Sequence, residues 1–154
     1  GYDGHPSINC TCTPGMIQRY KHRISGPLLD RIDLHVEVKP LLATKLIQTS
    51  SKANSSLQAS QHRIKNARRI QEKRWENLPH HFCNAQVTGK LIRENSRIDK
   101  QGLLILEKAA TKFGYSARVL DRLIKVARTI ADLEEQVNIQ ASHFAEAIQF
   151  RNII

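Results

Sequence analysis

The sequence predicts a mainly α-helical protein, a bundle of helices preceded by a single β-strand. Apolar residues recur at three- and four-residue spacing over most of the second half of the chain, the period of amphipathic helices. Strict alternation of apolar and polar residues is convincing over one stretch alone, Ile32 to Val38. The 154 residues, 40% of them hydrophobic, suffice for the core of one ordinary domain or two small ones.

The first segment, residues 1–12, is rich in Gly, Pro, Asn and Ser, a composition that predicts a loop. Thr13 and Pro14 then provide an N-cap and a first-turn proline, which predict a short helix up to His22 or Arg23. The end of this helix is strongly basic. Such an end fits either a solvated helix terminus or a surface that faces a neighbouring subunit or DNA, and Arg23 is the candidate for that contact.

A second short helix is expected to start at Pro27 and to end in a turn that presents Asp30 and Arg31. The alternating stretch Ile32 to Val38 follows directly and predicts a half-buried strand. One strand leaves backbone donors and acceptors unpaired. We therefore expect this strand to pair with strands that lie outside this chain, or with a second copy of itself.

The domain organisation follows from composition. Pro40 ends the strand, and a stretch rich in Ser, Thr and Asn comes after it. We therefore expect residues 1–40 to form one part, residues 41–55 to be a linker, and residues 56–154 to be a helical domain.

The helical domain is expected to start with a long helix from Ser55 or Ser56 to about Asn77. Its few apolar positions are interrupted by many cations. They form either a solvated helix face or a patch that contacts nucleic-acid phosphates. The candidate phosphate-binding residues are Arg63, Lys65, Arg68, Arg69, Lys73 and Arg74.

Further helices are predicted from capping residues and apolar stripes. The third of them has the widest apolar stripe and is expected to be buried in the bundle. The expected bounds are Thr88 to Glu94, Ser96 or Asp99 to Gly114, Ser116 to Glu134, and Gln140 to about Phe150.

The net charge of +10 and the pI near 9.9 predict a surface that attracts polyanions, of which nucleic acid is the default candidate. The sequence shows no membrane span, because no apolar run approaches about 18 residues, and no leader peptide. We therefore expect a cytoplasmic protein without a membrane partner.

The three cysteines do not suggest a disulfide framework, because their number is odd and two of them lie in C-T-C. Reduced or metal-bound thiols are expected instead. Cys83 belongs to no motif and is interpreted as a small buried hydrophobe.

Two stretches resemble a known family. They read R-I-S-G-P-L-L-D-R-I-D-L-H-V-E-V from Arg23 to Val38, and S-A-R-V-L-D-R-L-I-K-V-A-R-T-I-A-D-L-E from Ser116 to Glu134, followed by H-F-A-E-A-I-Q-F-R at the end of the last helix. They are similar to segments of AAA+ ATPases in the magnesium-chelatase-like ComM group. The resemblance implies the last strand and finger turn of a truncated α/β core, followed by an all-helical lid.

The resemblance also implies roles for two arginines. Arg31 matches the arginine finger, which acts in trans on the γ-phosphate of ATP bound to a neighbouring subunit, so in this chain alone it is expected to contact nothing. Arg118 matches the nucleotide-binding sensor 2 residue. A guanidinium suits both roles because it is permanently charged and binds phosphate through two parallel hydrogen bonds. The alternatives for Arg31 are a salt bridge with Asp30 or Asp33, or a solvated cation at a helix end. The alternative for Arg118 is an ordinary surface charge.

The first loop resembles the second half of the group's C-P-C-G-Y-x-G-x-P-x-x-x-C-x-C motif, which implies a four-cysteine zinc site. This chain carries only Cys10 and Cys12, and the other pair is expected before Gly1. His5 could replace one missing thiolate. The alternative is an empty half-site in a mobile loop.

The sequence contains neither a G-x-x-x-x-G-K-[ST] phosphate loop nor an apolar strand that ends in paired acids. We therefore expect this fragment to bind no cofactor and to be inactive alone, as a monomer or as a pair formed through its exposed strand. The resemblance implies that the full-length parent is an ATPase and DNA helicase that uses ATP and Mg²⁺. It also implies a homo-hexamer that drives branch migration on DNA during uptake and recombination. The alternative is a stand-alone basic helical module that binds nucleic acid.

Overall fold

The computed structural model describes residues 1–5, 7–38 and 53–151, including the side chains of all of these except residues 53–56. The described residues form helices and no β-strand, which confirms the prediction of a mainly helical fold. They divide into two compact units. The first contains residues 1–5, 7–32 and 37–38, and the second contains residues 33–36 and 53–151.

The first unit contains a loop and two short helices, α1 (Pro14–Lys21) and α2 (Gly26–Leu29). The Thr13 hydroxyl accepts a hydrogen bond from the Met16 backbone N–H (3.4 Å), and Pro14 occupies the first turn of α1, as the sequence predicts. No residue of α1 or α2 is buried. Local chemistry therefore defines these two helices, with little contribution from packing.

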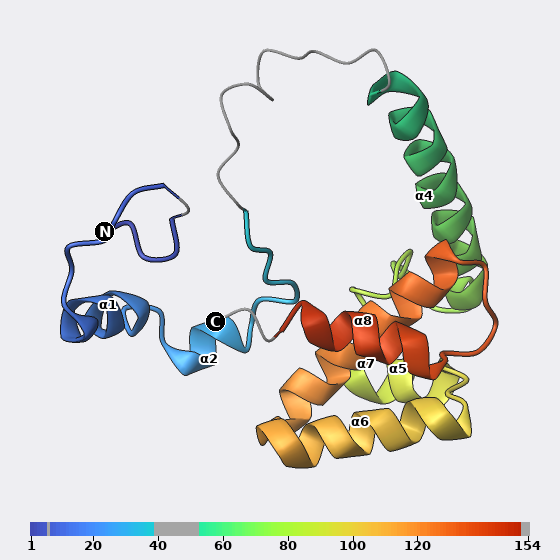
Figure 1. Ribbon diagram of the computed structural model, residues 1–154. Coiled ribbons are helices and arrows are strands. Elements are labelled where there is room, and N and C mark those ends of the chain that lie inside the picture. The colour runs from blue at the N-terminus through green and yellow to red at the C-terminus, as the bar shows by residue number, and fades with distance from the viewer. Residues whose placement is uncertain (6, 39–52, 152–154) are drawn as a thin grey trace. The chain divides into compact units, whose positions relative to one another are not determined.

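The second unit is a helical bundle (Figure 1). Helix α7 is its central element, because it contacts α4, α5 and α8, while α6 packs on α8. The helices are α4 (Ala53–Trp75), α5 (Gly89–Asn95), α6 (Lys100–Phe113), α7 (Ala117–Leu133) and α8 (Ala141–Gln149).

The core of the bundle forms around the apolar stripe of α7. Trp75 of α4, Ile92 of α5 and Phe144 of α8 are each fully buried with this stripe, and removal of such side chains from water is the main stabilising contribution. The buried apolar residues of α7 are Val119, Leu123, Ile124, Ala127, Ile130 and Ala131.

The helix boundaries agree with the predicted caps. Thr88, Asp99 and Ser116 each accept a hydrogen bond from the backbone N–H three residues later, at the first turns of α5, α6 and α7. Gly114 ends α6 in the left-handed conformation with φ of 63°, which glycine adopts without strain. Helix α4 begins two residues before the predicted Ser55, and the rest of the linker predicted over residues 41–55 lies largely outside the described residues.

The predicted strand over Ile32 to Val38 does not form within the described residues. The segment has no ladder hydrogen bonds, and its apolar side chains Ile32, Leu34, Val36 and Val38 are exposed. The alternation correctly indicates an extended backbone. A strand also requires a partner, however, and no neighbouring strand occurs among the described residues.

Candidate functional site

Arg31 lies directly after α2, in a turn closed by backbone hydrogen bonds. Its N–H donates to the Leu28 carbonyl (3.0 Å), and its Nη1 donates to the Pro27 carbonyl (3.3 Å). The side chain is exposed. The expectation that Arg31 contacts nothing in this chain is thus corrected, because its guanidinium rests on its own turn. Among the described residues the guanidinium donates one long hydrogen bond, to an uncharged carbonyl, which leaves most of its donors available to an anion.

Arg118 lies in the first turn of α7 and lines a cavity of about 300 Å³ in the second unit. Its side chain is exposed and forms no hydrogen bond or ion pair with any described residue. An arginine at a helix N-terminus is favourable for phosphate binding, because the free N–H groups there attract the same anion.

Arg118 shares its cavity with two other cations, Arg122 and Lys125, and with two acids, Asp33 and Asp121. Asp33, one of the acids considered for Arg31, forms an ion pair with Arg122 instead. Arg31 itself belongs to the first unit, and Arg118 belongs to the second.

The other two charged side chains of this cavity, Asp121 and Lys125, interact with neighbouring protein groups. Asp121 forms an ion pair with Arg93 of α5. The Lys125 Nζ donates to the Ala85 carbonyl at 3.1 Å. Burial lowers the pKa of the Lys125 ammonium, and the nearby Asp33 carboxylate opposes that shift. Arg118 is therefore the cation of this cavity that has no hydrogen-bond or ion-pair partner among the described residues.

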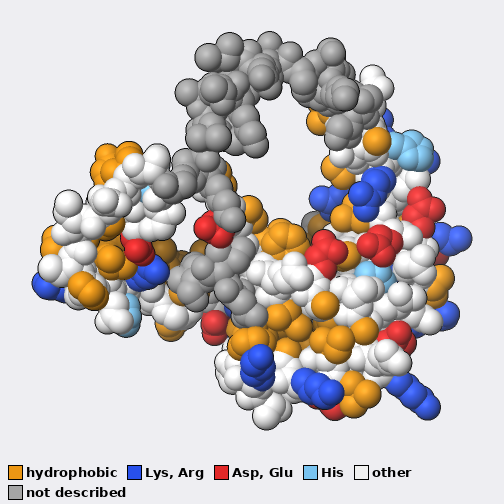
Figure 2. All heavy atoms as spheres, viewed as in Figure 1, with side chains coloured by type: hydrophobic (Ala, Val, Ile, Leu, Met, Phe, Trp, Pro, Cys, Tyr) orange, Lys and Arg blue, Asp and Glu red, His pale blue; other side chains and the backbone are white. Residues whose placement is uncertain are grey.

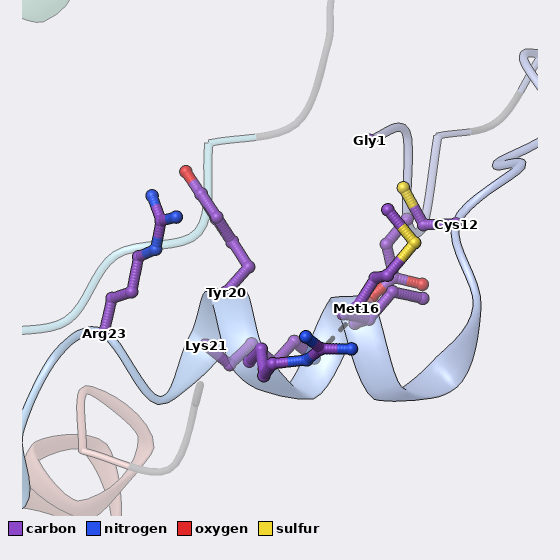
Figure 3. A pocket seen from close by; sticks show the side chains of 9 residues that line it. Gly1, Cys12, Met16, Tyr20, Lys21 and Arg23 are labelled. Carbon is purple, nitrogen blue, oxygen red and sulfur yellow. Dashed lines mark ion pairs between the residues drawn. The ribbon is translucent and has the colours of Figure 1, made fainter.

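Arg23, the interface candidate, lines a separate open cavity of about 640 Å³ in the first unit. Figure 3 shows Arg23 and Tyr20 extending in the same direction at one end of the cavity, while Cys12 and Met16 lie near Gly1 at the other. Arg23 is exposed. Its position is compatible with an interface contact, which stays a prediction.

The two candidate zinc ligands, Cys10 and Cys12, are half-buried free thiols. Hydrogen bonds from the backbone of Cys12 and Tyr2 lower the pKa of the Cys10 thiol and so favour its thiolate. Among the described residues, however, no group of three or more His, Cys, Asp or Glu side chains could hold a metal. His5 does not complete the pair, because its Nδ1 accepts hydrogen bonds from the N–H groups of Ser7 and Ile8. The donor set present therefore does not fit a structural zinc ion, which needs four ligands.

The candidate phosphate-binding residues of α4 separate into different environments. Lys65, Arg69 and Lys73 recur every four residues on the face opposite the buried stripe that includes Ala67 and Trp75. We call these three residues the basic ridge. Figure 2 shows Lys and Arg side chains in the region of α4. Arg63 and Arg68 are also exposed.

Arg74, also proposed from the sequence as a phosphate-binding residue, is engaged inside the protein. Its Nη1 donates to Asp132 Oδ2 at 2.8 Å and to Asn84 Oδ1 at 3.0 Å. Asn84 Oδ1 also accepts from the Trp75 indole at 3.1 Å. Its two partners, Asn84 and Asp132, are fully buried. We therefore assign Arg74 to the fold and remove it from the candidate nucleic-acid surface.

Arg128 completes this buried network. Its Nε donates to Asp132 Oδ1 at 3.0 Å, and its Nη1 donates to the Val137 carbonyl at 2.8 Å. Burial lowers the pKa of the Arg128 guanidinium, and the Asp132 carboxylate opposes that shift. Arg128 and Asp132 lie four residues apart on α7, a spacing at which an exposed pair contributes about 0.2–0.5 kcal/mol. The two side chains are 1% and 0% exposed, so removal of Asp132 would leave the Arg128 guanidinium buried without this countercharge.

His143, the first residue of the H-F-A-E-A-I-Q-F-R stretch, is a structural residue that sequence reasoning missed. Its Nδ1 accepts from the Gln140 backbone N–H (2.9 Å), so its proton lies on Nε2, which donates to Glu134 (3.0 Å). The side chain is 1% exposed. The signal available in the sequence was the spacing of three from Gln140, which is that of a capping box.

None of the described helices is both long and apolar enough to span a membrane.

Two family models match this chain, and together they span most of it. The C-terminal model of magnesium chelatase subunit ChlI matches residues 53–151, and the model of magnesium chelatase subunit ChlI matches residues 1–46. The first of these matches covers the helical unit that contains Arg118. The second covers the turn that contains Arg31.

Several curated proteins are similar to this chain. It is 37% identical to competence protein ComM of Haemophilus influenzae over 142 residues, which cover 92% of this chain and 27% of that protein. It is 35% identical to protein YifB of Escherichia coli, with the same two coverages. It is 33% identical over 144 residues to a protein of Mycobacterium bovis, covering 93% of this chain and 28% of the relative. The chain thus spans about a quarter of the length of the curated relatives it matches.

Proposed function

This chain belongs to the magnesium chelatase subunit ChlI family, and we propose that it supplies two arginines to ATP hydrolysis by a longer AAA+ ATPase of the ComM type. Arg31 is the arginine finger, which acts in trans on ATP bound to a neighbouring subunit. Arg118 is the sensor 2 residue of the helical lid. The observation that carries the proposal is that both family-like stretches present an exposed arginine with donors available to a phosphate.

The chemistry asked of these arginines is electrostatic. Charge on the phosphoryl oxygens must be stabilised during transfer, and a guanidinium forms charge-assisted hydrogen bonds with them in a fixed fork geometry. The fold supports this role for Arg118 through the Ser116 cap, which fixes the first turn of α7. In the proposed parent, ATP and Mg²⁺ are bound by regions of the longer protein, because this sequence carries no phosphate loop.

The proposed assembly is a homo-hexamer, because a finger that acts in trans requires each nucleotide site to lie between two subunits. The proposed substrate is DNA, in branch migration during uptake and recombination. The name of the Haemophilus influenzae relative, a competence protein, supports the proposed role in DNA uptake.

The basic ridge supports contact with nucleic acid. Like charges at four-residue spacing destabilise an isolated helix slightly, by about 0.2–0.5 kcal/mol for each pair. A polyanion removes this repulsion and gains a row of phosphate contacts. The same ridge supports the second candidate function, a basic helical module that binds nucleic acid without an ATPase. Measured ATP turnover of the full-length protein distinguishes the two, because only the first candidate requires it.

Replacement of the sensor 2 residue tests the first candidate. Arg118→Ala in the full-length protein should lower ATP turnover roughly tenfold or more, because a hydrogen bond to a charged group is worth about 1.5–3 kcal/mol. It should also reduce the protection from hydrogen exchange that nucleotide gives to the first turn of α7. Arg97→Ala removes another exposed arginine of the same unit and should change neither quantity. Normal turnover in Arg118→Ala would leave Arg118 a structural residue.

Neutralising the basic ridge tests the nucleic-acid contact. We expect Lys65→Gln, Arg69→Gln and Lys73→Gln together to weaken DNA binding and to reduce the slope of log affinity against log salt by about 2–3, one phosphate contact for each residue. Fluorescence anisotropy with labelled duplex DNA at several salt concentrations measures both effects. The matched control is Lys90→Gln, Lys100→Gln and Lys108→Gln, three exposed lysines of α5 and α6. Equal losses in both triple variants would show that only net charge matters.

A further inference from the structure

The segment Asp33–Val36, which we call the strap, packs with the helical unit although it follows the Arg31 turn directly. The His35 backbone N–H donates to the Phe150 carbonyl at the end of α8 (2.7 Å). The His35 side chain is 9% exposed, and its two ring nitrogens have no hydrogen-bond partner among the described residues. Burial of the ring and one backbone hydrogen bond therefore hold the strap on the bundle.

The first residue of the strap is held by α7. Asp33 forms an ion pair with Arg122, which lies four residues after Arg118 on the same helix. Asp33 and Arg118 also line the same cavity of about 300 Å³. A change in the position of α7 at this cavity therefore acts directly on Asp33.

Arg31 is only two residues before Asp33 in the sequence. The chain can extend by at most about 3.6 Å per residue, so Arg31 cannot move far unless the strap moves with it. The ion pair between α7 and Asp33, together with the two-residue step back to Arg31, thus provides a short path from the candidate sensor 2 helix to the candidate arginine finger of the same subunit.

We propose that Asp33 and Arg122 are positioning residues, and that their ion pair couples the position of α7 to the position of Arg31. This inference rests on the proposed function. When nucleotide binds at Arg118 and α7 changes position, the pair transmits that change to the finger that serves the neighbouring subunit. The position of the arginine finger in each subunit then depends on whether nucleotide is bound at Arg118 of the same subunit.

Removal of this ion pair should leave the fold of the helical unit intact. Asp33 is 53% exposed and Arg122 is 26% exposed at the side chain, and pairs of this kind contribute little to stability. His35 is buried and is not a member of the pair, so we expect it to hold the strap on the bundle when the pair is removed. Loss of coupling and loss of folding are therefore separable.

The experiment uses charge reversal in the full-length protein. Asp33→Arg and Arg122→Asp should each lower kcat for ATP roughly tenfold, a typical size for coupling between sites, with an unchanged KM for ATP and an unchanged melting temperature. The combined variant, with the pair reversed, should regain most of the lost kcat. Failure of the combined variant to recover would overturn the proposal.

The matched control is Lys90→Glu, which breaks the exposed ion pair between Lys90 and Glu94 within α5. It should leave kcat unchanged. If a reversal variant does not fold, Asp33→Asn and Arg122→Gln give a double-mutant cycle. In that cycle the double variant should be no slower than either single variant, and additive losses would overturn the proposal.

Arg31→Ala separates this inference from the proposed function. If Arg31→Ala loses turnover and the reversed pair does not recover, the coupling is overturned and the finger assignment stands. If Arg31→Ala has wild-type turnover, the finger assignment fails and the coupling fails with it.

Discussion

Arg31→Ala in the full-length protein should reduce ATP turnover roughly 10³-fold or more, the effect typical of an arginine finger. The reason is the position of the guanidinium, which is exposed and has, within the described part of the chain, a single hydrogen bond, to the Pro27 carbonyl of its own turn. The guanidinium can exchange this hydrogen bond for one to a phosphate oxygen with little loss of free energy. Nucleotide affinity should change little, because the finger mainly stabilises charge that develops during phosphoryl transfer.

The measurement is the ATP turnover rate at saturating ATP, together with nucleotide affinity from a fluorescent analogue. Arg19→Ala is a closely matched control, because Arg19 is also exposed and its Nε donates to the Gly15 carbonyl of its own helix (3.4 Å). Its turnover should equal that of the wild type. Unchanged turnover in Arg31→Ala would refute the finger assignment.

Asp132→Ala should destabilise the helical unit by about 3–5 kcal/mol, the range observed when one partner of a buried ion pair is removed. Asp132 is 0% exposed and accepts hydrogen bonds from Arg74, Arg128 and Asn84. Without this carboxylate, the guanidinium of Arg128 remains buried without a countercharge. Asn84 loses an acceptor at the same time.

Chemical denaturation followed by circular dichroism measures this effect as a lower midpoint for the unfolding of the helices. Glu94→Gln removes one partner of an exposed ion pair, with Lys90, and serves as the control, with a change below about 1 kcal/mol. A loss of less than about 1 kcal/mol in Asp132→Ala would show that the network contributes no more than a surface pair.

The helices could be predicted from the sequence because their signals are local. Thr13, Thr88 and Ser116 cap the helices that they were expected to cap, and Gly114 ends α6. A cap depends on the backbone a few residues away, so the sequence in that window contains the required information. The wide apolar stripe of α7 likewise predicts its central place in the bundle.

The buried network could not be predicted because its partners are distant in the sequence. Arg74 and Asp132 are 58 residues apart, and Asn84 comes from the loop between α4 and α5. Residue type does not distinguish a cation on the buried side of α4 from one on its exposed side, because Arg74 and Arg69 are both arginines. Only the fold shows that Arg74 faces Asp132 while Lys65, Arg69 and Lys73 face solvent.

The segment after Arg31 shows a different limit. The alternation over residues 32–38 predicts an extended chain, but pairing depends on a neighbouring strand, and the described residues provide none. The sequence also gave no reason to expect that Asp33 would pair with Arg122, 89 residues later. The resemblance therefore proposes Arg31 and Arg118 one residue at a time, and these roles stay predictions, while the pair between Asp33 and Arg122 became visible only in the structure.

The central claim, that Arg31 acts in trans, is tested most directly by mixing subunits of the full-length protein. One variant carries Arg31→Ala, and the other carries an inactivated nucleotide site and an intact Arg31. Each alone should be nearly inactive, and ATP turnover should reappear on mixing, because the second subunit supplies its finger to the intact site of the first. Absence of any recovery in mixed assemblies of confirmed composition would contradict a finger that acts between subunits.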